Sequence, residues 1–341
     1  MLERLWIAGF VSMMVTMIPL VLVLTLARSD TIAGTLNSSP RGGAMKGQGT
    51  AGACGDGTGV ISFQDKSLED LSLCGVHWTL IEFSSLQEAI LTGSDLSAAA
   101  IHNADLSGSS LVSTDMQGVD IDAANFRDID ASNCDMSEAS ISHTDLSLAH
   151  AVSGGPLKLN GASLADVSLT GAELPGAELR SIIMEKANMK SAHLSAADLG
   201  GSTIQYTNMA QAELEGAVLD GTTISFCDLG ESNLNGASMK GIAILDSNLA
   251  SANLEQADLQ GAQLDNCDIW SISLYGANLS GVTGDNLNLR LARMNGDTIC
   301  PDGDAAEYLG EGGGINNPQV GEYSCERAQR GEEVKALKKD V

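Results

Sequence analysis

The sequence has little positive charge. Its 341 residues include 18 lysines and arginines against 44 aspartates and glutamates, which gives a formal net charge of −26. Non-specific nucleic-acid binding uses lysine and arginine to displace counterions from phosphate, so this composition argues against that activity. Two alternatives remain, an acidic surface that serves only solubility and one that meets a basic partner.

Aromatic residues and prolines are also scarce. Phe, Tyr and Trp make up 4% of the chain and proline occurs 6 times, whereas glycine occurs 38 times and hydrophobic residues make up 43%. Such a chain buries apolar surface mainly with small and aliphatic side chains, which predicts a thin and regular core. A repeat architecture is therefore the first possibility to test.

Common catalytic and metal-binding motifs are absent from the sequence. It contains no phosphate-binding loop, nucleophile elbow, zinc-protease motif or dinucleotide fingerprint. It also lacks a CxxC pair or a His/Cys cluster with zinc-site spacing. We therefore expect no enzyme activity, no cofactor and no metal site.

One long hydrophobic run lies near the N-terminus. Residues 5–27 carry no charge, and about 20 apolar residues are enough to cross a bilayer as a helix. A cleavable signal peptide is the alternative, although its apolar region is usually only about 7–15 residues long. We expect residues 1–28 to be an uncleaved transmembrane anchor and residues 29–62 to be a flexible Gly/Ser-rich linker.

From about Val76 onward the sequence repeats every five residues, each unit having a small, a polar and an apolar residue in succession. Clear examples are Ala172-Glu173-Leu174, Ala197-Asp198-Leu199 and Ala252-Asn253-Leu254. The pattern resembles the pentapeptide-repeat family, whose consensus is A(D/N)LXX. The resemblance implies an all-β fold, a right-handed quadrilateral β-helix with four pentapeptides per coil.

A second spacing supports the four-sided coil independently of the resemblance. If one coil takes 20 residues, apolar central residues 20 apart must stack on one side. Isoleucine recurs at this spacing in both halves of the repeat, at Ile81, Ile101, Ile121 and Ile141 and again at Ile204, Ile224 and Ile244. A five-residue period alone does not predict this recurrence.

The two halves of the repeat differ in register by three residues. Central positions run to Ala151 and resume at Leu159, with a turn-rich Ser-Gly-Gly-Pro stretch between them. Leu164 then falls on the isoleucine side. We therefore expect a corner loop at 152–157 within one continuous solenoid.

The solenoid is expected to span residues 63–299, with caps at both ends because each coil contacts only its neighbours. The first cap is expected at Phe63–Val76, where three leucines cluster. Residues 300–341 are expected to form the C-terminal cap and tail.

In this register the central residue and the small residue two before it point inward. Four cysteines occupy small inward positions and are expected to be core residues without reactivity. They are Cys74, Cys134, Cys227 and Cys267. The five histidines fall at outward positions, and we expect solvated side chains there. They are His77, His102, His143, His150 and His193.

Cys300 and Cys325 lie beyond the last repeat. A disulfide between them would stabilise the C-terminal cap, which has little core of its own, with two free thiols as the alternative. The bond would imply an oxidising compartment. The flanking charges favour a cytosolic solenoid instead, because three cations follow the hydrophobic run and only Arg4 precedes it, and the more positive flank usually lies in the cytosol. We expect the solenoid on the non-cytosolic side, in the periplasm, outside the cell or in an organelle lumen such as the thylakoid.

Rows of acidic residues follow from the same spacing. Asp95, Asp115 and Asp135 should stack about 4.8 Å apart, so their carboxylates must be hydrated or hold cations weakly. A calcium site would need six to eight convergent oxygens, more than a flat row supplies.

One outward surface of the second half is unusually apolar. It includes Ile183, Tyr206, Phe226 and Leu245, and the two aromatic residues are 20 apart and should be neighbours. An exposed apolar patch usually marks a partner surface, although the rings could instead shield the backbone at a corner. We interpret the chain as a non-catalytic, membrane-anchored scaffold, or a subunit of a membrane complex, that binds proteins through this surface. The alternatives are an acidic DNA mimic, as in some members of the family that the repeats resemble, and a cell-envelope effector or adhesin.

Overall fold

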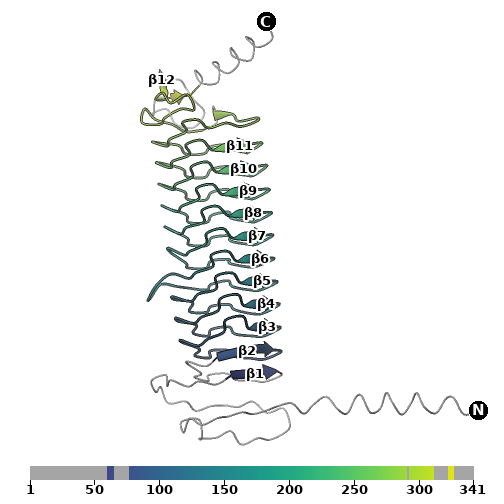
Figure 1. Ribbon diagram of the computed structural model, residues 1–341. Coiled ribbons are helices and arrows are strands. Elements are labelled where there is room, and N and C mark those ends of the chain that lie inside the picture. The colour runs from purple at the N-terminus through teal and green to yellow at the C-terminus, as the bar shows by residue number, and fades with distance from the viewer. Residues whose placement is uncertain (1–59, 65–76, 290–291, 311–321, 326–341) are drawn as a thin grey trace, which may run out of the picture. The chain divides into compact units, whose positions relative to one another are not determined.

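The computed structural model describes residues 60–64, 77–289, 292–310 and 322–325. They form a parallel β-solenoid in which one strand from each coil joins an 11-stranded sheet, ordered β1 to β11 (Figure 1). The strands are β1 (Val60–Gln64), β2 (His77–Glu82), β3 (Ala100–His102), β4 (Asp120–Asp122), β5 (Ser140–Ser142), β6 (Ser163–Ala165), β7 (Ile183–Glu185), β8 (Thr203–Gln205), β9 (Thr223–Ser225), β10 (Ala243–Leu245) and β11 (Gln263–Asp265). The described residues contain no α-helix.

The isoleucine column lies in register along this sheet. Ile81, Ile101, Ile121 and Ile141 are successive partners of β2 to β5, and the column continues through Leu164 and Met184 to Leu264. The predicted stacking is therefore confirmed. The physical reason is that backbone N–H and C=O groups pair between coils, which fixes equivalent residues one above another.

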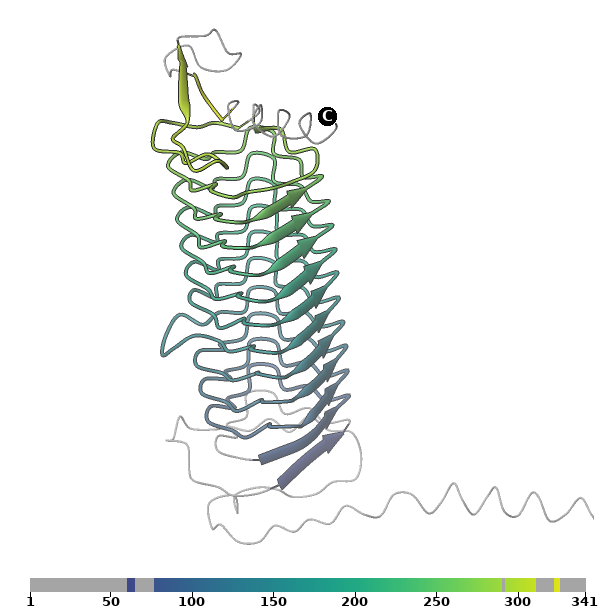
Figure 2. The same ribbon diagram turned by 45° about the horizontal axis from the view of Figure 1, so that its top comes forward.

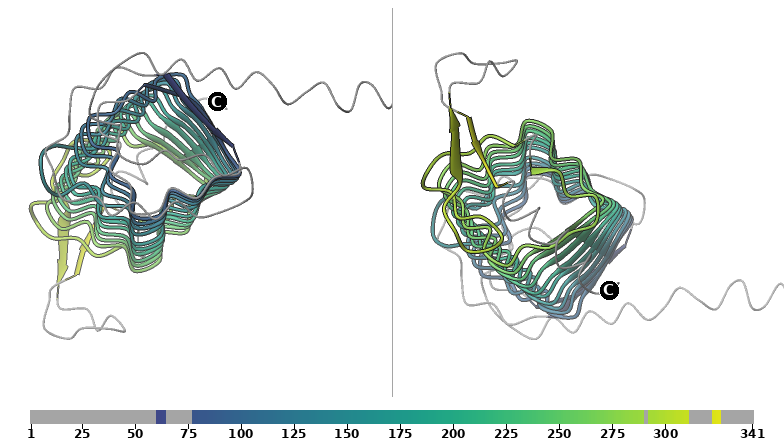
Figure 3. Two further views of the ribbon diagram at one scale, coloured as in Figure 1. Left: turned by 90° about the horizontal axis from the view of Figure 1, so that it is seen from below. Right: turned by 90° about the horizontal axis from the view of Figure 1, so that it is seen from above.

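Three columns of short parallel bridges form the other sides of each coil. Their first members pair Ser85 with Asp105, Ile90 with Ser110, and Asp95 with Asp115. Seen along the axis, the stacked coils have a four-sided outline (Figure 3).

The core is made of the two inward positions of each pentapeptide. Central Leu, Ile and Met residues are almost completely buried, as are the Ala, Ser, Thr and Cys residues two positions before them. Phe126 is the one aromatic side chain in the core of the described part. Small residues are required because the interior of a coil is narrow and close-packed.

The polar residue before each central residue has a structural role. Its side-chain oxygen accepts a hydrogen bond from the backbone N–H two residues later, as in Asp95 to Ser97 (3.0 Å) and Asn208 to Ala210 (3.0 Å). Asp and Asn form such turns readily. This role accounts for part of the acidity of the chain.

The loop between Ala151 and Leu157 leaves the coil and returns in register. Across it, Ile141 pairs with Leu164 and Asp135 with Lys158, so the sheet and the bridge column continue (Figures 1 and 2). Gly154 and Gly155 supply backbone angles of +110° and +136° that glycine adopts most readily.

The 11-stranded sheet ends after β11, where glycine takes the place of the aliphatic central residue in the next coil. Gly284 follows Leu264 in the column, and a Cβ atom there would overlap the backbone oxygen of Leu264. Beyond it, Cys300 and Cys325 form a disulfide with Cα atoms 5.5 Å apart. The antiparallel pair β12 (Glu307–Gly310) and β13 (Glu322–Ser324) lies in the same segment.

At the N-terminal end the sheet begins earlier than the domain boundary that we expected. β1 starts at Val60, so residues 60–62 pair with β2 instead of belonging to a linker. The hydrophobic run at 5–27, most of the linker and most of the first cap lie outside the described residues and stay predictions. No helix within the described part has the length and hydropathy of a membrane span.

Candidate interaction surface

Tyr206 and Phe226 form a stacked pair at one corner of the solenoid, called here the ring pair. Their ring centroids are 5.1 Å apart and their planes are inclined by 7°. The side chains are 53% and 52% exposed. The two rings are therefore neighbours, as the 20-residue spacing predicts, and about half of each remains in water.

The backbone at this corner does not favour aromatic residues. Tyr206 and Phe226 have φ angles of 53° and 55°, in the left-handed region. The residues that directly follow each strand form one column along this corner, called here the corner column. In other coils this column holds Asn103, Asn266 and Asn286, and asparagine tolerates the left-handed conformation. A left-handed conformation costs roughly 1–2 kcal/mol for most residues. The same column also holds Ala123 and Lys186, so the backbone does not require aromatic side chains at this corner.

Next to the ring pair lies a stretch of sheet without charged side chains. Its outward residues belong to β8, β9 and β10 and are called here the neutral face. They are Thr203, Gln205, Thr223, Ser225, Ala243 and Leu245, of which Ser225 is buried and the other five are partly buried. The three strands carry no ionised group in a chain of net charge −26, as is also true of β5 and β6, but among the described strands only here does the uncharged face adjoin a pair of stacked rings. The ring pair and the neutral face together are called the docking patch.

The other two predicted patch residues lie at its margins. Ile183 starts β7, pairs with Thr203 and is 59% exposed. Leu245 ends β10 and is half-buried. The structure thus places all four predicted residues on strands β7 to β10 or at their corner, with the ring pair as the most apolar part.

Two further exposed aromatic residues were not identified from the sequence. Trp270, 55% exposed, lies on the adjacent side of the solenoid, where the outward residues of the three preceding coils are Ala210, Gly230 and Ala250. Phe83, also 55% exposed, occupies the same corner column as the ring pair. The repeat pattern predicts that both side chains point outward. How much of each ring is exposed depends on the size of the neighbouring side chains, which the repeat pattern does not give.

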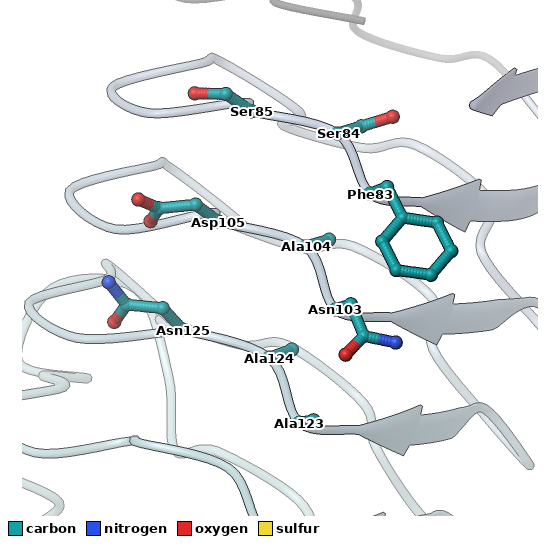
Figure 4. A pocket seen from close by; sticks show the side chains of 9 residues that line it. All are labelled: Phe83, Ser84, Ser85, Asn103, Ala104, Asp105, Ala123, Ala124 and Asn125. Carbon is teal, nitrogen blue, oxygen red and sulfur yellow. The ribbon is translucent and has the colours of Figure 1, made fainter. Parts of the chain in front are cut away.

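An open hollow of about 530 Å³ lies beside Phe83. Figure 4 shows its floor of small inward residues, Ser84, Ala104 and Ala124, between the corner column and the row that includes Asp105 and Asn125. Asp105 already accepts hydrogen bonds from the Gln87 amide and the Ser107 backbone N–H. The hollow is therefore a structural consequence of small corner residues rather than a built ligand site.

Two of the described histidines, His102 and His143, contact carboxylates. His143 Nδ1 lies 2.8 Å from Asp122 Oδ1, and Ser142 Oγ donates to the same oxygen at 2.7 Å. These two bonds hold the pKa of Asp122 below its usual value. Because Ser142 and His143 both bind Asp122 and do not bind each other, the cluster lacks the geometry that activates a serine nucleophile.

The acidic rows are bonded within their own turns. Asp95, Asp115 and Asp135 pair in register, and each accepts a backbone hydrogen bond from the residue two positions later. No group of three potential metal ligands occurs in the part of the chain that the structure describes.

The cysteine thiols within the coils are core groups. Cys134 and Cys227 are buried and Cys267 is partly buried. Desolvation raises the pKa of all three thiols, that of Cys267 to about 11. A raised pKa lowers the thiolate fraction and hence the reactivity.

Similarity to known proteins agrees with this geometry. The family described as "Pentapeptide repeats" matches in 8 copies, over residues 81–118, 114–150, 162–201, 197–236 and 246–281, which together make up more than half of the chain. No curated protein matches the sequence.

Solved structures of similar proteins include HetL from the cyanobacterium Nostoc sp. strain PCC 7120. It is 25% identical over 72% of this chain and 91% of that one, with a TM-score of 0.28. QnrB1, a plasmid-mediated fluoroquinolone resistance protein, is 15% identical over 66% of this chain and 93% of that one, with a TM-score of 0.31.

A pentapeptide repeat protein from the Arabidopsis thaliana thylakoid lumen is 23% identical over 32% of this chain and 65% of that one, with a TM-score of 0.14. The repeat matches, the 20-residue register and the parallel four-sided solenoid lead to one conclusion. The chain belongs to the pentapeptide-repeat family.

Proposed function

We propose that this protein is a non-catalytic, membrane-anchored scaffold that binds another protein through the docking patch. The observation that carries the proposal is the exposed ring pair on a left-handed backbone beside an uncharged face. Aromatic side chains commonly supply the anchor residues of interfaces, and truncating one at a well-packed centre costs about 2 kcal/mol or more.

Two further features support the cellular part of the proposal. The uncharged run at residues 5–27 has the length of a membrane anchor. The Cys300–Cys325 disulfide is suited to an oxidising compartment. A solenoid tethered on the non-cytosolic side, as a subunit or assembly factor of a membrane complex, combines both features.

The experiment is co-purification of partners in mild detergent with the full chain and with Tyr206→Ser/Phe226→Ser. The thermal midpoint should remain nearly unchanged, because the same corner column holds Asn103 and Ala123 in other coils, while the recovered partner should fall at least tenfold. Ile90→Ser/Val152→Ser is the matched control, since it removes two exposed apolar residues outside the patch (43% and 60% exposed). If the ring variant unfolds several degrees earlier and retains its partner, the rings shield the coil and the proposal fails.

A further inference from the structure

The docking patch is small compared with a stable protein interface. It spans three coils, about 14 Å along the axis at 4.8 Å per coil, and one strand face with its corner. We estimate its area at roughly 200–300 Å², whereas each partner of a typical specific interface buries about 800 Å². Contact with a partner must therefore continue over the residues that surround the patch.

The charged residues among them are mainly acidic. On the N-terminal side of the patch Glu185 ends β7 and Lys186 directly precedes Tyr206 in the corner column, with Asp166 one coil farther away, and on the C-terminal side lie Asp246 and Asp265. The nearby cation Lys186 is already 3.4 Å from Glu185. An interface that extends in either direction along the axis thus meets carboxylates.

The carboxylates keep capacity for a partner. The Asn266 amide donates to Asp246 Oδ1 at 3.2 Å, the Asp285 backbone N–H donates to Asp265 Oδ1 at 2.8 Å, and the Gln263 amide donates to Asp265 Oδ2. An ionised carboxylate can accept about four hydrogen bonds. Arginine and lysine are the side chains that form the strongest such bonds.

On the basis of the proposed function, we infer that the partner presents a basic surface, with an apolar anchor for the ring pair and arginine or lysine side chains around it. A second copy of this chain is a poor match. It carries the same acidic margin and a net charge of −26, and like charges facing each other across an interface are unfavourable.

The inference can be tested by site-specific photocrosslinking in the full chain. The photoreactive residue p-benzoylphenylalanine replaces Gln205, on the neutral face, or Asn235, on another side of the solenoid, as the control. Crosslinked peptides from native membranes are identified by mass spectrometry. We expect position 205 to capture a protein segment with an excess of lysine and arginine.

The outcomes separate the two proposals. Capture of an acidic or neutral segment, or of another copy of this chain, overturns the inference about charge but leaves a partner at the patch. Crosslinking at position 205 that does not exceed that at position 235 overturns the docking patch itself, and the inference with it.

Charge reversal of the margin provides the quantitative test with the captured protein. Asp246→Lys/Asp265→Lys should weaken binding at least tenfold and reduce its salt dependence. Glu88→Lys/Asp128→Lys changes the net charge equally at two exposed remote positions and should have a much smaller effect. Asp246→Asn/Asp265→Asn, which preserves side-chain shape, should give an intermediate loss. Equal effects of the two reversals would show that only overall charge matters and would contradict the inference.

Discussion

Removal of the Cys300–Cys325 disulfide should loosen one end of the solenoid without unfolding the rest. The bond closes a sequence separation of 25 residues. The chain-entropy relation for a loop of this length gives about 3.5 kcal/mol of stabilisation. In a solenoid each coil contacts only its neighbours, so this free energy belongs mainly to the terminal coil.

The contacts around the disulfide show which backbone amides should become less protected from hydrogen exchange. The disulfide is buried, and Cys325 Sγ lies 3.6 Å from Met294 Sδ. The backbone N–H groups of Cys300 and Ala306 donate to oxygens of Asp304 and Thr298 within the same segment. These amides should lose protection first when the covalent link is removed.

Hydrogen exchange measured by mass spectrometry can compare the native chain with Cys300→Ser/Cys325→Ser. About 3.5 kcal/mol corresponds to a few-hundred-fold loss of protection, since 1.4 kcal/mol is a factor of ten. We expect a loss of up to this size at residues 298–306 and almost no change at Leu214 and Leu219 in the middle of the stack. A uniform loss along the solenoid, or none at the cap, would refute the reasoning.

Three shorter predictions concern the coils. In the native chain at pH 8, Cys134 should not react with iodoacetamide, and Cys267 should react at least a hundredfold more slowly than a free thiol; labelling within minutes would contradict the assigned burial. Asp122→Asn should lower the thermal midpoint at pH 7, and the difference should shrink as the pH falls below about 4 and vanish once the pH is below the lowered pKa of Asp122, because a carboxyl with a lowered folded pKa contributes stability above its unfolded pKa and loses it as the pH falls through the folded pKa; a difference that does not shrink between pH 7 and pH 2 argues against this origin. Phe126→Ala should cost about 3–5 kcal/mol of unfolding free energy and Phe126→Leu less than about 1.5 kcal/mol, and chemical denaturation that ranks them in reverse would contradict the packing.

The main features of the fold could be predicted because a coil interior permits few side chains. Aliphatic residues predominate at the central position and small residues two positions before it, with Phe126 and Ile182 among the exceptions, so recurrence at 20 residues reveals the sides directly. The corner loop was also readable, because Leu164 returns to the isoleucine column despite the insertion. The start of the sheet was not, since Val60–Gln64 precedes the recognisable repeats.

The interaction surface could be predicted only in part. The spacing placed Tyr206 beside Phe226, but it did not show that their backbone is left-handed or that Leu245 is half-buried. Trp270 was overlooked although its outward position follows from the register. Exposure depends on the neighbours, and only the structure shows the small outward residues in the coils that precede it.

We propose that another protein covers the ring pair when the chain is anchored in its native membrane. Hydroxyl-radical footprinting of Tyr206 and Phe226, read by mass spectrometry, tests it directly by comparing the purified full chain with the chain in native membranes. Trp270 serves as a second aromatic probe outside the docking patch. We predict ready oxidation of the ring pair in the purified protein and at least fivefold protection in membranes. Equal oxidation of both rings in the two states would contradict the claim.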